Sequence, residues 1–162
     1  MGHQRRVSHR GGSGRTAVDL KEEGVAMAPT KHAQKLRRAA ERKGKAEDQH
    51  QLAHLLFNGR EGLKQDHVAA AKWFLKAAVQ EHAGAQCDIG QCYVDGEGVE
   101  QNHALGATWV SKAADQGDVS AQGFLGCLYE KGQGVKQNDA LAVAWCEKGA
   151  VGMTPSPNST SA

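Results

Sequence analysis

Two nearly identical glycine-rich stretches, YVDGEGVEQN at Tyr93–Asn102 and YEKGQGVKQN at Tyr129–Asn138, are the first candidates for chemistry in this chain of 162 residues. Backbone N–H groups of a glycine-rich loop can bind phosphate, usually with a lysine nearby. However, no G-K-[ST] motif follows either stretch, and Glu97 and Glu100 would repel an anion. A structural turn has reason to recur at a fixed interval and an active site has none, so the sequence favours a turn.

Histidine and cysteine residues are the other candidates for chemistry. Cys87 and Cys92 are spaced more widely than a usual zinc pair, and they would face opposite sides of a helix. No Ser/His/Asp arrangement and no paired carboxylates can be placed in one pocket. The sequence therefore predicts no catalytic, cofactor or metal site and no enzymatic activity. The histidines considered are scattered along the chain: His50, His54, His67, His82 and His103.

The glycine-rich stretches belong to a longer internal repeat. Shifting the sequence by 36 residues aligns Tyr93 with Tyr129, Trp109 with Trp145, and the glycines of the two stretches with each other. A third, partial copy lies upstream, where Trp73 precedes a K-A-A triplet. The repeat predicts three units, 47–82, 83–118 and 119–154, and a period of this size is typical of a solenoid.

Each unit has the pattern of a helix, a loop and a second helix. Apolar residues recur along one helical face in both halves of each unit, and glycines interrupt the pattern between them. Asp66, Asn102 and Asn138 stand where an N-cap would begin the second helix. Trp109 recurs on the apolar face, which predicts that it is buried between its own unit and the next. In the first unit Gln49 interrupts the apolar face, and Arg60 replaces the first loop glycine.

The motif A-x-x-x-[IL]-G-x-x-Y-x-x-G-x-G-V-x-x-[DN], followed by W-x-x-K-A-A, resembles the Sel-1-like repeat family over about residues 47–152. The family is a relative of the tetratricopeptide repeats. The resemblance implies an all-α fold, a right-handed α/α superhelical solenoid whose first helices line a concave face. It also implies an adaptor that assembles protein complexes.

The four cysteines are expected to be reduced. Cys92 and Cys146 occupy core positions of the repeat, whereas Cys87 and Cys127 would lie opposite the core. Cys87 and Cys127 would be too far apart for a disulfide on adjacent helices, whose axes pack about 8–10 Å apart. Free thiols predict a reducing compartment, the cytoplasm, with the nucleus as an alternative.

The charge distribution separates an N-terminal segment from the repeats. Residues 1–45 carry 12 Lys and Arg against 4 Asp and Glu, while the remainder carries 8 against 14. We predict disordered tails at residues 1–30 and 155–162 and a basic, helical leader at 31–46. The basic segment Lys31–Lys45 offers the alternative function, a nucleic-acid-associated or nuclear protein. It has no aromatic residue to stack a base, which favours a solvated helix. No apolar run is long enough to span a membrane.

The predicted function is a scaffold that binds a protein or peptide segment on the face of its first helices, without a cofactor. Positions opposite the core should be exposed there, and several of them are apolar. The predicted partner-binding residues are Gln51, Leu55 and Asn58 in the first unit, Cys87, Gln91 and Val94 in the second, and Cys127 and Glu130 in the third.

Overall fold

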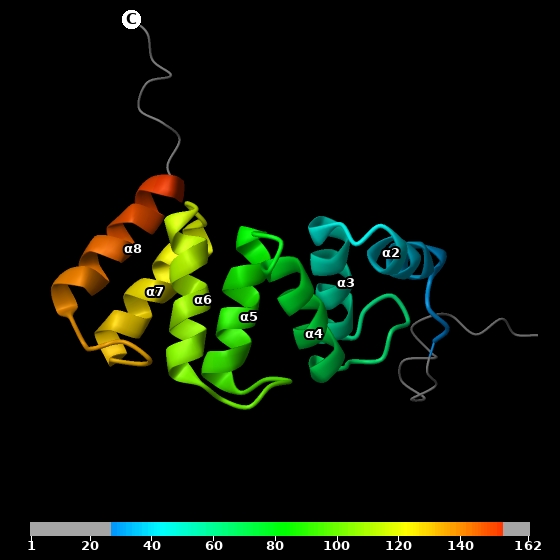
Figure 1. The fold of residues 1–162 in the computed structure, drawn as a ribbon, viewed down its shortest axis with the longest axis horizontal. Coiled ribbons are helices and arrows are strands. Elements are labelled where there is room, and N and C mark those ends of the chain that lie inside the picture. The colour runs from blue at the N-terminus through cyan, green and yellow to red at the C-terminus, as the bar shows by residue number, and fades with distance from the viewer. Residues whose placement is uncertain (1–26, 154–162) are drawn as a thin grey trace, which may run out of the picture.

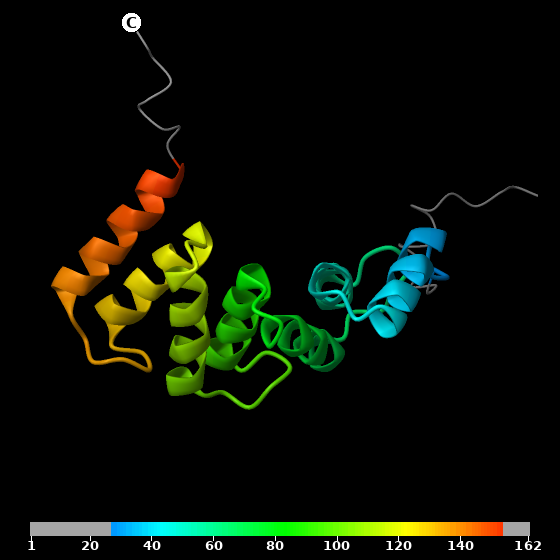
Figure 2. The same cartoon turned by 45° about the horizontal axis from the view of Figure 1, so that its top comes forward.

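The computed structural model describes residues 27–153 as a row of paired helices (Figure 1). The described part contains helices only, and they form a solenoid. The three pairs are α3 with α4, α5 with α6, and α7 with α8, and α2 precedes them. Figure 2 shows the pairs following one another along a curved row. The helices are α2 (Lys31–Arg42), α3 (Ala46–Asn58), α4 (His67–Ala78), α5 (Ala83–Asp95), α6 (His103–Asp115), α7 (Val119–Lys131) and α8 (Asp139–Met153).

The second helix of each pair begins at the predicted cap. The side chains of Asp66, Asn102 and Asn138 accept hydrogen bonds from the backbone N–H groups of Ala69, Leu105 and Leu141, at 2.9, 3.0 and 3.0 Å. Each cap satisfies an N–H group that the first helical turn leaves without a partner. The N-cap prediction is confirmed in all three units.

The glycine-rich loops pack against the backbone of the preceding unit. Gly98 and Gly134 have φ of +73° and +72°, and a Cβ on either would lie 2.0 Å from the carbonyl oxygen of His67 or His103. Those carbonyls belong to the start of the second helix one unit earlier. A residue with a side chain would meet backbone there, so the glycines recur because the contact between units recurs.

Helix α2 covers the first unit in the way that each second helix covers the next unit. Ala33, Leu36 and Ala40 are buried against α3. A Cβ on Gly62, the counterpart of Gly98, would lie 2.2 Å from the carbonyl oxygen of Ala28. The Thr30 side chain caps α2 and donates a 2.8 Å hydrogen bond to Glu61. The segment from Ala28 through α2 therefore packs as an integral part of the solenoid.

Residues 1–26 and 154–162 lie outside the described residues, and most of the two predicted disordered tails falls there. Among residues 27–153, no helix combines the length and the apolar character that crossing a membrane requires.

The first unit is one residue longer than the repeat interval suggested. Gly59, at φ +62°, ends α3 in the left-handed conformation, as Gly96 and Gly132 end α5 and α7. The loop glycine Gly62 still precedes Gly98 by 36 residues, so the additional residue lies in the loop. The prediction that Arg60 replaces the first loop glycine was wrong, because Gly59 takes that place.

The corrected register gives Gln49 a role. Gln49, Gln86 and Gln122 lie at equivalent positions of the first helices, and each amide donates to a carbonyl at the end of the preceding helix. Gln116 in turn donates to the Gln86 side chain at 2.7 Å. Gln86 is fully buried, and its hydrogen bonds offset the cost of removing its amide from water. Gln49 therefore links the first unit to α2 and does not interrupt the core.

The tryptophans do not occupy the predicted place. Trp109 is half-buried and packs back against the core of the first unit and α5, not between its own unit and the next. Lys112 places its Nζ atom 4.7 Å from the centre of the Trp109 ring, and Lys76 and Lys148 lie over Trp73 and Trp145 at 4.2 Å. The W-x-x-K spacing thus produces a cation–π contact, worth about 0.5–1 kcal/mol at an exposed site.

The last helix leaves one face open. Phe74 and Val110 are buried by the first helix of the unit that follows, but no described helix follows α8. Cys146, at the same position of the third unit, is therefore exposed, as is Val143 at 58%. The prediction of a core position was right for Cys92 and wrong for Cys146.

All four cysteines are free thiols. Two of them are buried and two are exposed. Burial raises the pKa of the Cys87 and Cys92 thiols to about 12, while Cys127 and Cys146 are exposed. We expect iodoacetamide to alkylate Cys127 and Cys146 in the native protein and to leave the other two unmodified. Peptide mass spectrometry of native and urea-unfolded samples measures this. Rapid native alkylation of Cys92 would contradict the core position of this thiol.

Candidate functional site

The first helices α3, α5 and α7 form one layer of the solenoid. α5 contacts α7 directly, and His50 of α3 lies within hydrogen-bonding distance of Asp88 of α5. The second helices pack behind this layer. The face predicted to bind a partner is therefore a continuous surface built from three units.

A pocket opens in this layer between α3 and α5. Its volume is about 260 Å³, slightly below the roughly 300–1,000 Å³ typical of small-molecule sites. Phe57 supplies most of the open apolar surface, because Phe74 and Cys92 are only 2% and 3% exposed, and amides, carboxylates and an imidazole supply polar groups. The lining residues are His54, Phe57, Asn58, Phe74, Asp88, Gln91, Cys92 and Glu97. This size and this mixture suit a single large side chain with an apolar stem and a positively charged end.

The structure brings part of the predicted partner face together. Asn58 and Gln91 are exposed and line the pocket, and Cys127 and Glu130 are exposed on α7. Gln51 is exposed on α3, where its amide donates to Glu47 at 2.7 Å, and it does not line the pocket.

Three of the predicted positions are not open. Cys87 is 8% exposed and Val94 is 4% exposed, because both pack in the core cluster that α5 shares with α6 and α7. Leu55 is half-buried and packs against the first core cluster. The prediction that these apolar residues form an exposed strip was wrong, since the neighbouring helices cover them.

A polar cluster at the α3–α5 joint was missed by the sequence analysis. The Nε2 atoms of His50 and His54 lie 2.7 and 3.0 Å from Oδ2 of Asp88 and 3.1 Å from each other. With α3 in its correct register, His50 and His54 replace Gln51 and Leu55 as the counterparts of Cys87 and Gln91. The signal available from sequence was the spacing of four residues between the two histidines, which places them on one helical face.

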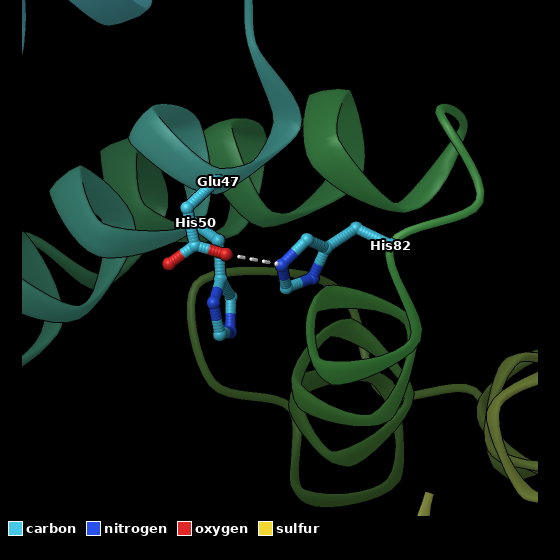
Figure 3. Close-up of side chains that lie close together, drawn as sticks. All are labelled: Glu47, His50 and His82. Carbon is cyan, nitrogen blue, oxygen red and sulfur yellow. Dashed lines mark hydrogen bonds and ion pairs between the residues drawn. The ribbon is translucent and has the colours of Figure 1, made fainter. Parts of the chain in front are cut away.

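A second histidine–carboxylate pair adjoins the first group. His82 accepts a hydrogen bond from the Ala85 N–H through Nδ1 and donates through Nε2 to Glu47 at 3.0 Å. Figure 3 shows the His50 ring beside this pair, with Glu47 and His50 projecting from α3 and His82 from the start of α5. The rings of His50 and His82 are 4.5 Å apart.

The protonation of the cluster follows from these contacts. Burial raises the pKa of Asp88, but hydrogen bonds with His50 and His54 outweigh this effect and hold the pKa below its ordinary value. The hydrogen bond with Asp88 raises the pKa of His54, and the hydrogen bond from His82 lowers that of Glu47. Asp88 is therefore a carboxylate at neutral pH, and it places negative charge beside the pocket.

The observed repeat boundaries and loop contacts agree with one family. The profile of the Sel1 repeat matches residues 46–82, 83–118 and 119–150, and the first of these spans is one residue longer than the second, as the structure requires. The chain belongs to the Sel1 repeat family. Proteins built from Sel1 repeats generally mediate protein–protein interaction and are generally non-enzymatic scaffolds.

Solved structures of other Sel1 repeat proteins resemble this chain. A protective antigen of uropathogenic Escherichia coli with an SLR fold is 34% identical, with a TM-score of 0.70, over 74% of this chain and 25% of the antigen. A Sel1 repeat protein from Oxalobacter formigenes is 35% identical, with a TM-score of 0.68, over 74% of this chain and 47% of that protein. The chain thus spans a quarter to a half of the length of these two proteins.

A third structure shows the fold alone. Cysteine-rich protein B of Helicobacter pylori is 20% identical, with a TM-score of 0.59, over 75% of this chain and 91% of that protein. A search of curated proteins finds no match.

Proposed function

We propose that this chain is an interaction module that performs no chemistry and binds a protein segment along the concave face formed by its first helices. The observation that supports this most directly is the pocket between α3 and α5. It combines the half-buried ring of Phe57 with the carboxylates of Asp88 and Glu97. Interfaces commonly bind one anchor side chain in such a pocket and surround it with polar contacts.

The charge of the site specifies the kind of segment. Asp88 and Glu97 line the pocket, and Glu130 is exposed further along the layer. The repeats as a whole are acidic, with 14 Asp and Glu against 8 Lys and Arg from residue 46 onward. The proposed partner segment therefore carries a lysine or arginine as the anchor for the pocket, next to apolar residues that contact the ring of Phe57.

The test starts from a peptide selected for binding to the purified full-length chain. Asn58→Arg and Gln91→Arg place a positive charge at the rim of the pocket, and we expect each to weaken binding at least about tenfold, or about 1.4 kcal/mol. Thr108→Arg adds the same charge to the second-helix layer and should leave affinity unchanged. Leu55→Asp is unsuitable, because Leu55 packs against the core. Isothermal titration gives the affinities, and melting curves verify that each variant folds.

The basic segment Lys31–Lys45 is the alternative binding surface. α2 buries Ala33, Leu36 and Ala40 and leaves Lys35, Arg37 and Arg38 exposed. If affinity survived both pocket variants and fell after Lys35→Gln, Arg37→Gln and Arg38→Gln, the proposed face would be wrong. Binding of a DNA or RNA oligonucleotide that weakens steeply with salt would then favour a nucleic acid as the partner.

A further inference from the structure

We infer that His50, His54 and Asp88 form a binding site for a divalent transition-metal ion, with Zn²⁺ as the reference ion, at the joint between the first two repeats. The Nε2 atoms of His50 and His54 and the Oδ2 atom of Asp88 lie 2.7–3.1 Å from one another. Three atoms this close can all contact one ion at the 2.0–2.2 Å usual for zinc with imidazole nitrogen and carboxylate oxygen. This inference does not rest on the proposed partner, and the two compete at Asp88: a bound Zn²⁺ would reverse the charge beside the pocket, so the lysine or arginine anchor applies to the metal-free chain.

The arrangement of the ligands is that of known metal sites. His50 and His54 are four residues apart on α3, a spacing that places two imidazoles on one side of a helix, where they can share an ion. Asp88 reaches the same point from α5 in the next unit. Two imidazoles and one carboxylate suit zinc and the neighbouring first-row metals, and calcium or magnesium would require more oxygen ligands.

The contacts among the three residues cannot all be hydrogen bonds. Each ring nitrogen either carries a proton or offers a lone pair. If both Nε2 atoms carry protons, the His50–His54 contact at 3.1 Å sets two N–H groups against each other. If only one carries a proton, one of the contacts with Asp88 joins two lone pairs. A single cation between the three atoms would accept all three lone pairs at once.

The surroundings are partly shielded, as a specific site requires. The His50 side chain is 16% exposed and that of Asp88 is 27% exposed, while His54 is more open. His54 and Asp88 also line the pocket of about 260 Å³. Zinc with three protein ligands keeps a fourth position for water or another ligand. Here that position would lie beside the pocket.

Glu47, His50 and His82 form another group whose ligand-type atoms lie within 4.8 Å of one another. This group is the weaker candidate, because both nitrogens of His82 already have partners. Nδ1 caps α5 through Ala85, and Nε2 donates to Glu47. Binding an ion there would break one of these hydrogen bonds. The structure therefore assigns the ion to His50, His54 and Asp88.

The experiment is a titration of the full-length chain with Zn²⁺ after treatment with EDTA and removal of the chelator. We expect saturable binding and a higher melting temperature with zinc, because an ion that binds only the folded chain stabilises it. His54→Gln and Asp88→Asn should each weaken binding at least about tenfold, since loss of an outer-shell partner alone costs about 10–100-fold. The matched variant Glu47→Gln, also on α3, should leave affinity unchanged, because the hydrogen bonds of Glu47 go to His82 and Gln51 and not to the three ligands.

Several results would overturn the assignment. Absence of saturable binding by the parent chain would exclude the site. Undiminished binding by His54→Gln and Asp88→Asn would do the same, as would loss of binding only in Glu47→Gln. A titration of the parent chain with Co²⁺ guards against misfolded variants. An intense near-ultraviolet thiolate-to-cobalt band would place the ion on cysteine and refute the proposal, and a spectrum without that band is expected.

Discussion

Gly98→Ala is expected to be among the most damaging small substitutions in this protein. The new Cβ would lie 2.0 Å from the carbonyl oxygen of His67 and 2.4 Å from its carbonyl carbon. Both are backbone atoms in the first turn of α4, so they cannot turn aside as a flexible side chain could. The backbone at residue 98, with φ of +73°, adds about 1–2 kcal/mol of strain for a residue other than glycine. Together with an overpacking cost of about 1–3 kcal/mol, the expected loss is about 2–5 kcal/mol.

Gly117→Ala is the matched control for this substitution. Gly117 also has a positive φ, +89°, but a Cβ there would meet no atom within 4 Å. Only backbone strain remains, and the expected loss is about 1–2 kcal/mol. Urea denaturation of the two variants measures the difference. Equal losses would mean that the loop and the preceding unit are not in contact, and the packing between units described above would then be wrong.

Phe74→Ala should also destabilise the protein strongly, by about 3–5 kcal/mol. The Phe74 side chain is 2% exposed in the core of the first two units, and its ring lies 5.1 and 6.2 Å from those of His54 and Phe57. Its removal would leave a cavity beneath the pocket, and the surrounding helices can close it only in part. A small domain is stable by about 5–15 kcal/mol, so this loss would be a large fraction of the total.

Cys146→Ala is the matched control, because Cys146 occupies the position of Phe74 in the third unit but is exposed. Cys146 is exposed because no described helix follows α8, so its truncation should change the free energy of unfolding by less than about 0.5 kcal/mol. Thermal melting of both variants is sufficient for the comparison. A large destabilisation by Cys146→Ala would show that the open face of α8 is covered in solution, for example by a second copy of the chain.

The repeat, the helix pairs and the caps were available from the sequence alone. Glycines that must approach a neighbouring backbone, asparagines that cap a helix, and apolar residues at helical spacing are local requirements, and each recurs with the unit. Because each of these requirements involves residues close together in the sequence, each produces a recognisable sequence pattern. The fold could therefore be predicted from these patterns. The W-x-x-K motif could also be recognised in the sequence. The unit against which Trp109 packs could not, because a half-buried ring can pack against either the preceding or the following unit.

The tertiary structure decided which surfaces are open and which side chains meet. A single additional residue in the first loop shifts α3 against the repeat, and this shift places His50 and His54, not Gln51 and Leu55, beside Asp88. Aligning identical residues could not locate that insertion, because the aromatic Phe57 fits opposite Tyr93 equally well. Cys87 and Val94 are covered by neighbouring helices, whereas Cys146 is exposed where the described row of helices ends. Burial at these positions depends on whether a helix of the neighbouring unit packs against them. The sequence of a residue's own unit does not specify that neighbouring helix.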